Sequence, residues 1–528
     1  MQSRAFPGQS RSGQPFDSRR RQVLLAGALG VPALSLMGRS AFAANGKNSV
    51  SLAMIGEPQT LDPMFTTADL VGTLMQHVYE PLYTFDSHWR IVPMLAAAMP
   101  TVLDGGKQVD IPLRKGLVFH DGKPVQIGDV VASLKRWMEV SPRGKSVAAE
   151  VVSVEAASDS VLTFKLKSPY APLLAQLALP TSMAAVMPAS TIAAQLTEFI
   201  GTGPYRLKER RPDQYTILEK FDQYAARTEA PDGYGGRRIA YIQELRFIPV
   251  PDSNTRVEGV LSGQFDFADL LPTEAAGRLE QGGKQVVPLI GKNFGFPYLV
   301  FNTKGTLDSA ALRQTAQAAI GAEELMAAAF GDPKFFSIGA NFFPQGTPYY
   351  SLAGQERYNV NDPKKAAELA KKAGYAGKPI RILASRQYEF HYNMALVLSE
   401  QFKRAGLEVD LQVVDWATLL QRRNDPSLWD IYITHSGIFP EPMLSPPQLG
   451  DNAPGWWETP EKKAVLDAFN REMDLSKRGP LWGTVQELVY EQVPFIELGK
   501  FNSLSARSAK LQGYNPSAWP AFWNVKLA

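Results

Sequence analysis

The fold class is decided by residues 380–434, which read IRILASRQYEFHYNMALVLSEQFKRAGLEVDLQVVDWATLLQRRNDPSLWDIYIT. Short apolar runs alternate here with longer segments whose apolar residues recur at helical spacing. The pattern predicts three strands and two helices in alternation, at Ile380–Ala384, Glu389–Arg404, Leu407–Val413, Trp416–Arg422 and Trp429–Thr434. Strands that alternate with helices form a sheet with parallel strands and helices on its faces, so we expect an α/β fold with mixed sheets.

The same pattern extends outward from this stretch. Upstream, Asp362-Pro363 is typical of a helix start, because Asp caps the first backbone amides and Pro fits the first turn, while Gly374 marks the helix end. Downstream, the sequence predicts two helices and a strand at Pro460–Met473, Lys477–Tyr490 and Phe495–Leu498.

The first half of the chain is richer in strands. They are predicted at Ser49–Ile55, at Val151–Ala156 with Val161–Leu166, and at Tyr205–Glu209 with Tyr215–Lys220. A helix with an apolar face from Leu70 to Val78 is expected to be capped by Thr67. The change of pattern near residue 300 predicts two lobes, and a cleft between lobes is a natural ligand site.

The N-terminal region has the three zones of an export leader. Arg20-Arg21 precedes an apolar run from Val23 to Met37, which is too short to span a bilayer comfortably. The run is followed by Ala41-Phe42-Ala43, a small-x-small cleavage signal. We expect a twin-arginine-type signal peptide at residues 1–43 and a mature protein that begins near Ala44, exported to the periplasm and soluble after cleavage.

Charge and composition exclude several classes of function. The formal net charge is +3, but residues 1–43 hold six arginines and one acid, so the mature chain carries −2 and gives no support to nucleic-acid binding. The chain has no cysteine and therefore no disulfide. Its five histidines show no metal-ligand spacing, so no metal and no cofactor are expected.

The common catalytic motifs are missing. We find no G-x-S-x-G, Walker loop or H-E-x-x-H in the sequence. Gly201-Thr202-Gly203 resembles the start of a dinucleotide loop, but Pro204 follows it and the third glycine is absent. The sequence therefore predicts no catalytic residue and no enzyme.

Six motifs, in order along the mature chain, carry a resemblance to the family 5 solute-binding proteins of ABC importers, the dipeptide, oligopeptide and nickel-binding group. They are Thr60-Leu61-Asp62-Pro63, Tyr79-Glu80-Pro81-Leu82, Leu113-Arg114-Lys115-Gly116 with Phe119-His120-Asp121-Gly122-Lys123-Pro124, Gly201-Thr202-Gly203-Pro204-Tyr205, Asp362-Pro363 to Ala373-Gly374-Tyr375, and Val493-Pro494-Phe495-Ile496. Of these residues, His120, Asp121, Gly122 and Gly203 are expected to set turns and packing.

The resemblance implies a two-lobe periplasmic binding protein fold that closes around its ligand by a hinge. Lobe I would comprise residues 44–302 and 495–528, with an inserted subdomain at about 93–200, and lobe II would comprise 303–494. The implied protein is the periplasmic substrate-binding subunit of an ABC importer, a monomer that delivers a peptide or peptide-like organic solute to an inner-membrane permease and binds no nucleic acid.

The loop after the strand Trp429–Thr434 supplies several candidate ligand contacts. In relatives that bind peptides, this loop carries an acid that holds the amino group of the peptide. The candidates here are His435, Ser436, Gly437, Phe439 and Glu441. The family pattern has one acid directly before a proline, and Glu441 lies closest to that position. It has a second, an aspartate nearer the glycine, and Ile438-Phe439 stands there instead. The loss of this aspartate argues against dipeptide specificity. His435 is a ligand contact or a satisfied polar group at a strand end.

Other loops at lobe edges add further candidates. Thr66, Thr67 and Ala68 follow the T-L-D-P motif, where relatives approach the ligand. Trp416 walls the cleft or belongs to the core. Of the neighbours Trp456 and Trp457, one packs while the other faces the cleft or solvent, and we select Trp457 as the candidate contact. Arg386 pairs with a ligand carboxylate or lies on the surface.

Three rival functions stay open at this point. A receptor for nickel or another metal chelate, from the same family, requires His435 in the cleft and a bound metal. A periplasmic peptide-handling enzyme requires turnover. A sensor or chaperone that binds peptides without transport would lack neighbouring genes for a permease and ATPases.

Overall fold

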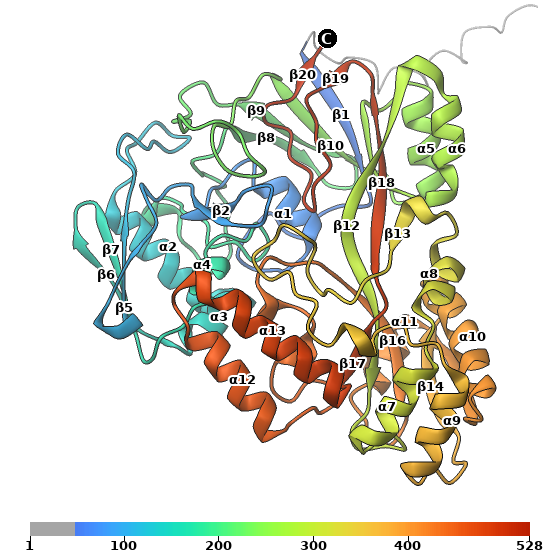
Figure 1. Ribbon diagram of the computed structural model, residues 1–528. Coiled ribbons are helices and arrows are strands. Elements are labelled where there is room, and N and C mark those ends of the chain that lie inside the picture. Colours follow the sequence, from blue (N-terminus) through green and yellow to red (C-terminus); the bar gives the residue numbers. More distant parts are fainter. Residues whose placement is uncertain (1–47) are drawn as a thin grey trace, which may run out of the picture. The chain divides into compact units, whose positions relative to one another are not determined.

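The computed structural model describes residues 48–528, so the predicted signal peptide lies outside the described residues. One large mixed sheet dominates them, with the strand order β15-β14-β16-β12-β18-β11-β1-β10-β9-β8. Its two central strands, β12 (Val286–Phe301) and β18 (Lys500–Ser508), pair antiparallel and run side by side in Figure 1. We call the strands beyond β18 the β1 side of the sheet, and those beyond β12 the β14 side.

The β1 side is built around a parallel trio of strands. β1 (Ser49–Met54) pairs in parallel with β10 (Glu244–Pro249) and with β11 (Phe267–Leu271). Parallel neighbours require crossover connections, which here contain helices. The remaining elements of this side are β8 (Tyr205–Arg211), β9 (Tyr215–Lys220), α5 (Ser253–Leu261), α6 (Ala276–Gln281), and the small pair β19 (Leu511–Gln512) and β20 (Lys526–Leu527).

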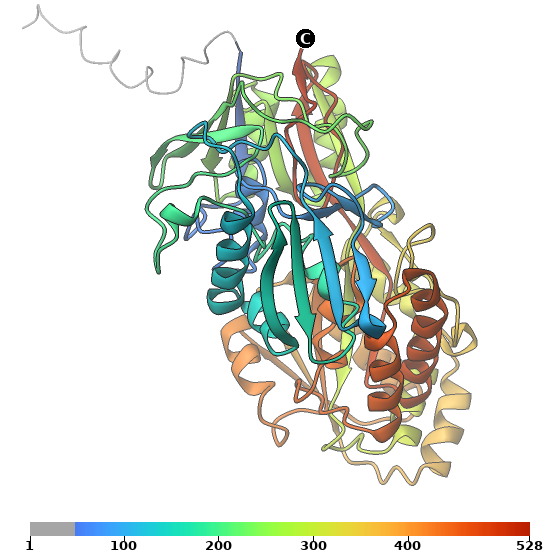
Figure 2. The ribbon, with the colours of Figure 1, turned by 90° about the vertical axis from the view of Figure 1, so that its left-hand side faces the viewer.

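A four-stranded antiparallel sheet adjoins the β1 side and stands in front in Figure 2. Trp137 of the adjacent helix α2 is fully buried and donates its indole N–H to the carbonyl of Ser182 at 2.7 Å. The elements of this part are β4 (Thr101–Leu103), β5 (Gln108–Pro112), α2 (Ile127–Val140), α3 (Pro142–Ala148), β6 (Val151–Ser158), β7 (Val161–Leu166) and α4 (Leu173–Gln176).

The β14 side confirms the α/β prediction. β14 (Ile380–Ser385) pairs in parallel with β15 (Val409–Val414) and β16 (Ile431–Gly437). The helices that follow β14 and β15, α10 (Glu389–Arg404) and α11 (Trp416–Arg422), have the predicted bounds. Further helices of this side are α7 (Ala310–Ala319), α8 (Ala322–Phe330) and α9 (Pro363–Lys372), and the short strand β13 (Phe336–Ser337) pairs with β18.

The last helices differ slightly from the prediction. α12 (Pro460–Arg471) ends two residues early, and α13 (Leu475–Gln492) begins two residues early because Asp474 accepts a hydrogen bond from the amide of Ser476. The chain then enters β17 (Phe495–Glu497), which pairs with β12, and returns through β18 to the β1 side.

The first helix corrects a predicted cap. α1 (Asp69–Met75) follows Ala68 rather than Thr67, and Ala68 supplies no side-chain hydrogen bond. Because alanine has no side-chain acceptor, the first amides of this helix lack the predicted Thr cap. The chain then passes through the hairpin of β2 (Tyr83–Phe85) and β3 (Ile91–Pro93).

Two of the sequence motifs pack against each other. Nε2 of His120 lies 3.0 Å from the carbonyl oxygen of Gly203, and the amide of Gly201 donates to Nδ1 of His120 at 3.2 Å. A Cβ on Gly201 would stand 2.0 Å from the carbonyl oxygen of Val78. These motifs therefore hold neighbouring segments together inside the fold.

Within residues 48–528, no helix combines the length and the apolar character needed to cross a membrane.

Candidate functional site

A cavity of about 930 Å³ lies where the two sides of the sheet face each other, and we call it the main cavity. Its lining comes from the end of β11 and the segment after it, from both central strands, and from the start of α10 on the β14 side. This volume lies within the range of about 300–1,000 Å³ that is typical of ligand pockets.

The wall of the main cavity is aromatic. The ring of Phe330 stacks on Phe501 with centroids 5.3 Å apart, and lies 5.4 Å from the ring of Phe390. Phe294 and Tyr388 also line this cavity. Aromatic walls suit an apolar or aromatic part of a ligand, since each ring offers a large contact area with little loss of conformational entropy.

A smaller cavity of about 80 Å³ adjoins the main cavity and shares Leu270, Phe294 and Ser503 with it. Its remaining lining residues belong to the β1 side. We call it the acidic chamber and define it by its polar residues Asp69, Thr73, Asp269, Ser505 and Tyr514.

Both carboxyl groups of the acidic chamber have raised pKa values. Burial raises the pKa of Asp69, and the indole N–H of Trp519, which donates at 2.7 Å, opposes the shift. Burial also raises the pKa of Asp269 to about 6, and the negative charge of Asp69 adds to the shift. Asp69 is nevertheless an exposed residue, because the chamber that it lines admits water. A positive charge placed between the two carboxylates would lower both pKa values.

The backbone is irregular where the cavities meet. Leu270 has a φ of 43°, and the pairing of β11 with β18 shifts register between Ala268 and Leu271. Asn293, next to Phe294, has a φ of 54°. A left-handed conformation costs a residue with a side chain about 1–2 kcal/mol, and such strain clusters at functional sites.

A third cavity, of about 500 Å³, also reaches Phe294 and Ser503. It contains Asp86, His88 and Asp232, the only group within residues 48–528 whose ligand atoms, all within 4.8 Å of one another, could hold a metal. Both carboxylates already accept hydrogen bonds that hold the surrounding loops in place. Asp86 accepts the Nε–H of Arg90 at 2.6 Å, and Asp232 accepts the amide of Ser87 at 3.1 Å. We therefore assign the group a structural role.

The predicted residues Thr66, Thr67 and Ala68 lie directly before Asp69, with Thr67 and Ala68 exposed. The hydroxyl of Thr66 accepts the amide of Ala68 at 3.1 Å, which shapes the loop at the start of α1. These residues therefore adjoin one residue of the acidic chamber in the sequence, but none of the three lines it.

In the predicted loop after β16, Phe439 reaches the β1 side. The ring of Phe439 lies 6.2 Å from that of Trp519, and the guanidinium of Arg143 lies 5.2 Å above it. Gly437 pairs with Gly295 at the end of β16, and the hydroxyl of Ser436 bonds that of Ser445 at 2.6 Å.

His435 and Trp416 form one aromatic cluster behind the wall of the main cavity. Tyr388 brings them together, with its ring centroid 4.9 Å from Trp416 and 4.8 Å from His435. Nδ1 of His435 lies 3.0 Å from Nε2 of His391. Burial lowers the pKa of His435 to about 4 and that of His391 to about 2, so both imidazoles are neutral at pH 7. The described residues offer this pair no third metal ligand.

None of the eleven predicted contacts is among the residues that line the three cavities, and three of them are engaged elsewhere. Glu441 is 1% exposed, and its carboxylate accepts two hydrogen bonds from Arg478 at 2.7 and 2.9 Å. Trp457 is buried in the core, where it donates to a glutamine side chain at 2.6 Å. Arg386 is exposed, with its guanidinium 4.3 Å above the ring of Tyr392.

Sequence reasoning missed Asp69, Asp269, Phe294 and Tyr514. Asp69 is one residue beyond a predicted contact loop and could have been included on that ground. No local signal marks the other three, because they lie on β11, on β12 and just after β19, and these segments meet only in the packed chain.

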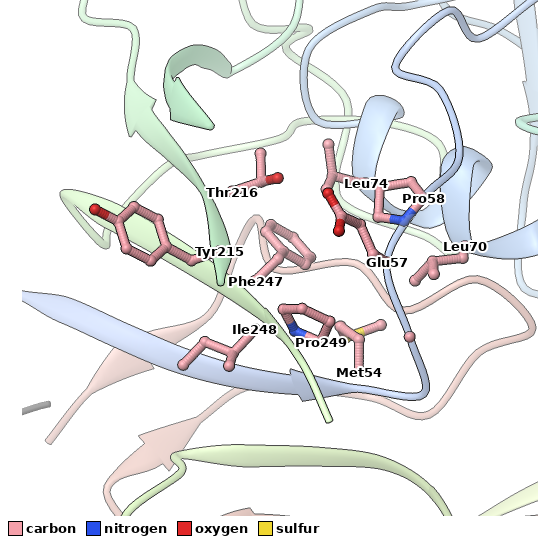
Figure 3. Close-up of a pocket in the computed structure, with 11 residues that line it drawn as sticks. Met54, Glu57, Pro58, Leu70, Leu74, Tyr215, Thr216, Phe247, Ile248 and Pro249 are labelled. Atoms are coloured by element: carbon pink, nitrogen blue, oxygen red, sulfur yellow. The ribbon is translucent and has the colours of Figure 1, made fainter. Parts of the chain in front are cut away.

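Figure 3 shows a different pocket, formed on the β1 side by Met54, Glu57, Leu70, Tyr215 and Phe247 among others. Its volume of about 10 Å³ is room for one water molecule. It is therefore too small to be the ligand site.

Comparison with known proteins places this geometry in context. Residues 90–455 match the model of the bacterial extracellular solute-binding proteins, family 5 middle. A probable peptide ABC transporter periplasmic-binding protein of Sinorhizobium fredii is 27% identical over 96% of this chain and 99% of its own length. The oligopeptide-binding protein AppA of Bacillus subtilis is 25% identical over 89% of this chain and 90% of its own.

Among solved structures, the ABC transporter substrate-binding protein CtaP of Listeria monocytogenes superimposes with a TM-score of 0.77 at 20% identity. The match covers 91% of this chain and 99% of that one, so the two proteins share their fold over nearly their whole lengths.

Proposed function

The chain belongs to the family 5 bacterial extracellular solute-binding proteins and serves as the substrate-binding subunit of an ABC importer, and we propose that its ligand is a peptide or peptide-like organic solute. Two relatives matched over most of their lengths are named for peptide transport or oligopeptide binding. The observation that carries the proposal is the main cavity, whose 930 Å³ is lined from both sides of the sheet.

The two sides of the sheet correspond to the two lobes. Lobe I comprises residues 44–302 and 495–528, with the four-stranded sheet inside an inserted subdomain at about 93–200, and lobe II comprises 303–494. In support, the chain passes between the two sides at β12 and at β17–β18, and the amide of Phe301 donates to the carbonyl of Pro494 at 3.0 Å where the crossings meet.

Ligand capture proceeds by closure of one lobe onto the other. The contacts of Phe439 with Trp519 and Arg143 across the cleft stabilise the closed form. Thr66, Thr67 and Ala68 approach the ligand from lobe I, and Tyr388 and the loop after β16 approach it from lobe II. The protein performs no chemistry, acts as a monomer, and presents its closed form to an inner-membrane permease. The signal peptide at 1–43 directs it to the periplasm.

The proposal is tested on mature protein purified gently from cells that express the full chain. Native mass spectrometry should detect a bound peptide or peptide-like solute, and the ligand should leave unchanged in mass. Small-angle X-ray scattering should show a smaller radius of gyration after the ligand is added back. A protein that carries no such ligand, and whose melting temperature no peptide raises, would contradict the proposal.

A further inference from the structure

We propose that the acidic chamber holds a compact cationic group of the ligand, a primary ammonium or a guanidinium, while the rest of the ligand occupies the main cavity. This inference rests on the proposed function and specifies in addition that one end of the ligand carries a positive charge. It is carried by acceptors with few partners that face a small chamber, which opens into the main cavity.

The carboxylates of the chamber have almost no partners within residues 48–528. Asp69 accepts one hydrogen bond, from Trp519, and Asp269 accepts one from the backbone amide of Leu270. Arg256 is close enough to influence Asp269, but its guanidinium donates to four backbone carbonyls, those of Val250, Pro251, Asp269 and Leu270. Asp269 is half-buried, and a charged acceptor that is removed from water with few partners is costly, so a ligand cation would relieve that cost.

Three hydroxyl groups point to the same conclusion independently of the acids. Thr73, Ser505 and Tyr514 are 3%, 6% and 6% exposed, and all three line the chamber. Within the described part of the chain, none of their hydroxyls bonds another side chain, and none is among the buried atoms shut off from solvent, so each oxygen is open to the chamber. Buried hydroxyls are normally satisfied, which leaves the chamber as the source of their partner.

The number and kind of acceptors fit a small organic cation. An ammonium has three donors and a guanidinium has five, and neither has an acceptor. Two carboxylates and three hydroxyl oxygens can receive those donors. Arg143 is the one cation that acts on Asp69, and its guanidinium lies over the ring of Phe439, so it offsets only part of the negative charge.

Size and continuity agree with this assignment. The chamber holds about 80 Å³, and a single water needs roughly 10–15 Å³ by this measure, so there is room for an ammonium or guanidinium but not for a ligand body. Because Leu270, Phe294 and Ser503 line both cavities, a ligand can reach from one into the other.

The test uses pools of di- to pentapeptides and the mature protein freed of ligand. One pool lacks Lys, Arg and His and has free amino termini, a second is the same pool after N-acetylation, and a third is N-acetylated but contains Lys and Arg. The first and third pools separate an N-terminal amine from a side-chain cation as the source of the charge. Affinity-selection mass spectrometry reports which peptides are retained, and calorimetry gives their Kd.

We expect the first or the third pool to bind about 10- to 100-fold more tightly than the second, since bonds to a charged group are the strong ones. Asp269→Asn should remove most of that preference, and Asp159→Asn, an exposed carboxylate in the turn between β6 and β7, should keep it. The pool comparison needs no variant, so it stands even if Asp269→Asn folds poorly.

Two outcomes would overturn the inference. Equal retention of the acetylated, cation-free pool would leave the peptide receptor standing and remove the cation site. Retention of no pool would contradict the inference and the peptide ligand together.

Discussion

The buried pair of Glu441 and Arg478 allows a sharp test, because the loop that carries Glu441 is also the predicted ligand loop. The two side chains are 1% and 0% exposed, and the guanidinium donates twice to the carboxylate, at 2.7 and 2.9 Å. Arg478 also donates to the hydroxyl of Tyr349. In this geometry Glu441 supports the loop from behind and is not free to bind a ligand.

Glu441→Gln keeps the shape of the side chain but leaves the charge of Arg478 buried without a counter-ion. Breaking one partner of such a pair costs about 3–5 kcal/mol. In a protein of this size, the melting temperature should fall by about 3–5 °C. Glu487→Gln, an exposed glutamate on the same helix as Arg478, should leave the melting temperature unchanged.

Differential scanning calorimetry on Glu441→Gln, Arg478→Met and the double variant measures the coupling between the two residues. The double variant should be less destabilised than the sum of the single variants by at least about 2 kcal/mol, because it removes both charges. The ligand Kd of Glu441→Gln should stay within about twofold of the wild type. A wild-type melting temperature combined with a large loss of affinity would refute this reasoning and return Glu441 to the ligand site.

Three further changes are predictable. The Asp269 carboxyl holds its proton more tightly in the folded chain, so it favours folding below about pH 4, and this benefit is lost as the pH rises through about 6. Asp269→Asn should therefore stabilise the unliganded protein by roughly 2–3 kcal/mol at pH 8 and by little at pH 4. Thermal melts at both pH values would measure this difference. Phe439→Ala should weaken ligand binding about tenfold and enlarge the liganded radius of gyration in scattering experiments, because the ring makes two contacts across the cleft. Gly201→Ala should lower the free energy of unfolding by several kcal/mol, which urea titration would report as a lower midpoint. Gly128→Ala, with open space around it on α2, should be neutral or slightly stabilising.

The stability predicted for Asp269→Asn has a consequence for function. A carboxylate that destabilises the unliganded protein and is relieved by a cation is an example of stability given up for binding. The same variant should therefore be more stable and a weaker receptor, and a gain in both properties would contradict the role of the acidic chamber.

Local patterns were sufficient wherever an element is determined by its own residues. The periodicity of apolar residues predicted α10 and α11 with their observed bounds, and Asp362-Pro363 correctly predicted the start of α9. Caps were less predictable, as α1 illustrates, because this helix begins after Ala68 without any side-chain cap although Thr67 was available next to it.

The sequence by itself therefore determined the α/β class, most helices of the β14 side and, through six motifs, the family. Only the tertiary structure decided which side chains meet in the cleft. Asp69 and Asp269 are 200 residues apart in the sequence, on α1 and β11, and they converge only in the packed chain, where both line the acidic chamber. Glu441 has the right residue type in the right loop, yet its partner lies on α13, and that pairing is a property of the packed chain that no local pattern encodes.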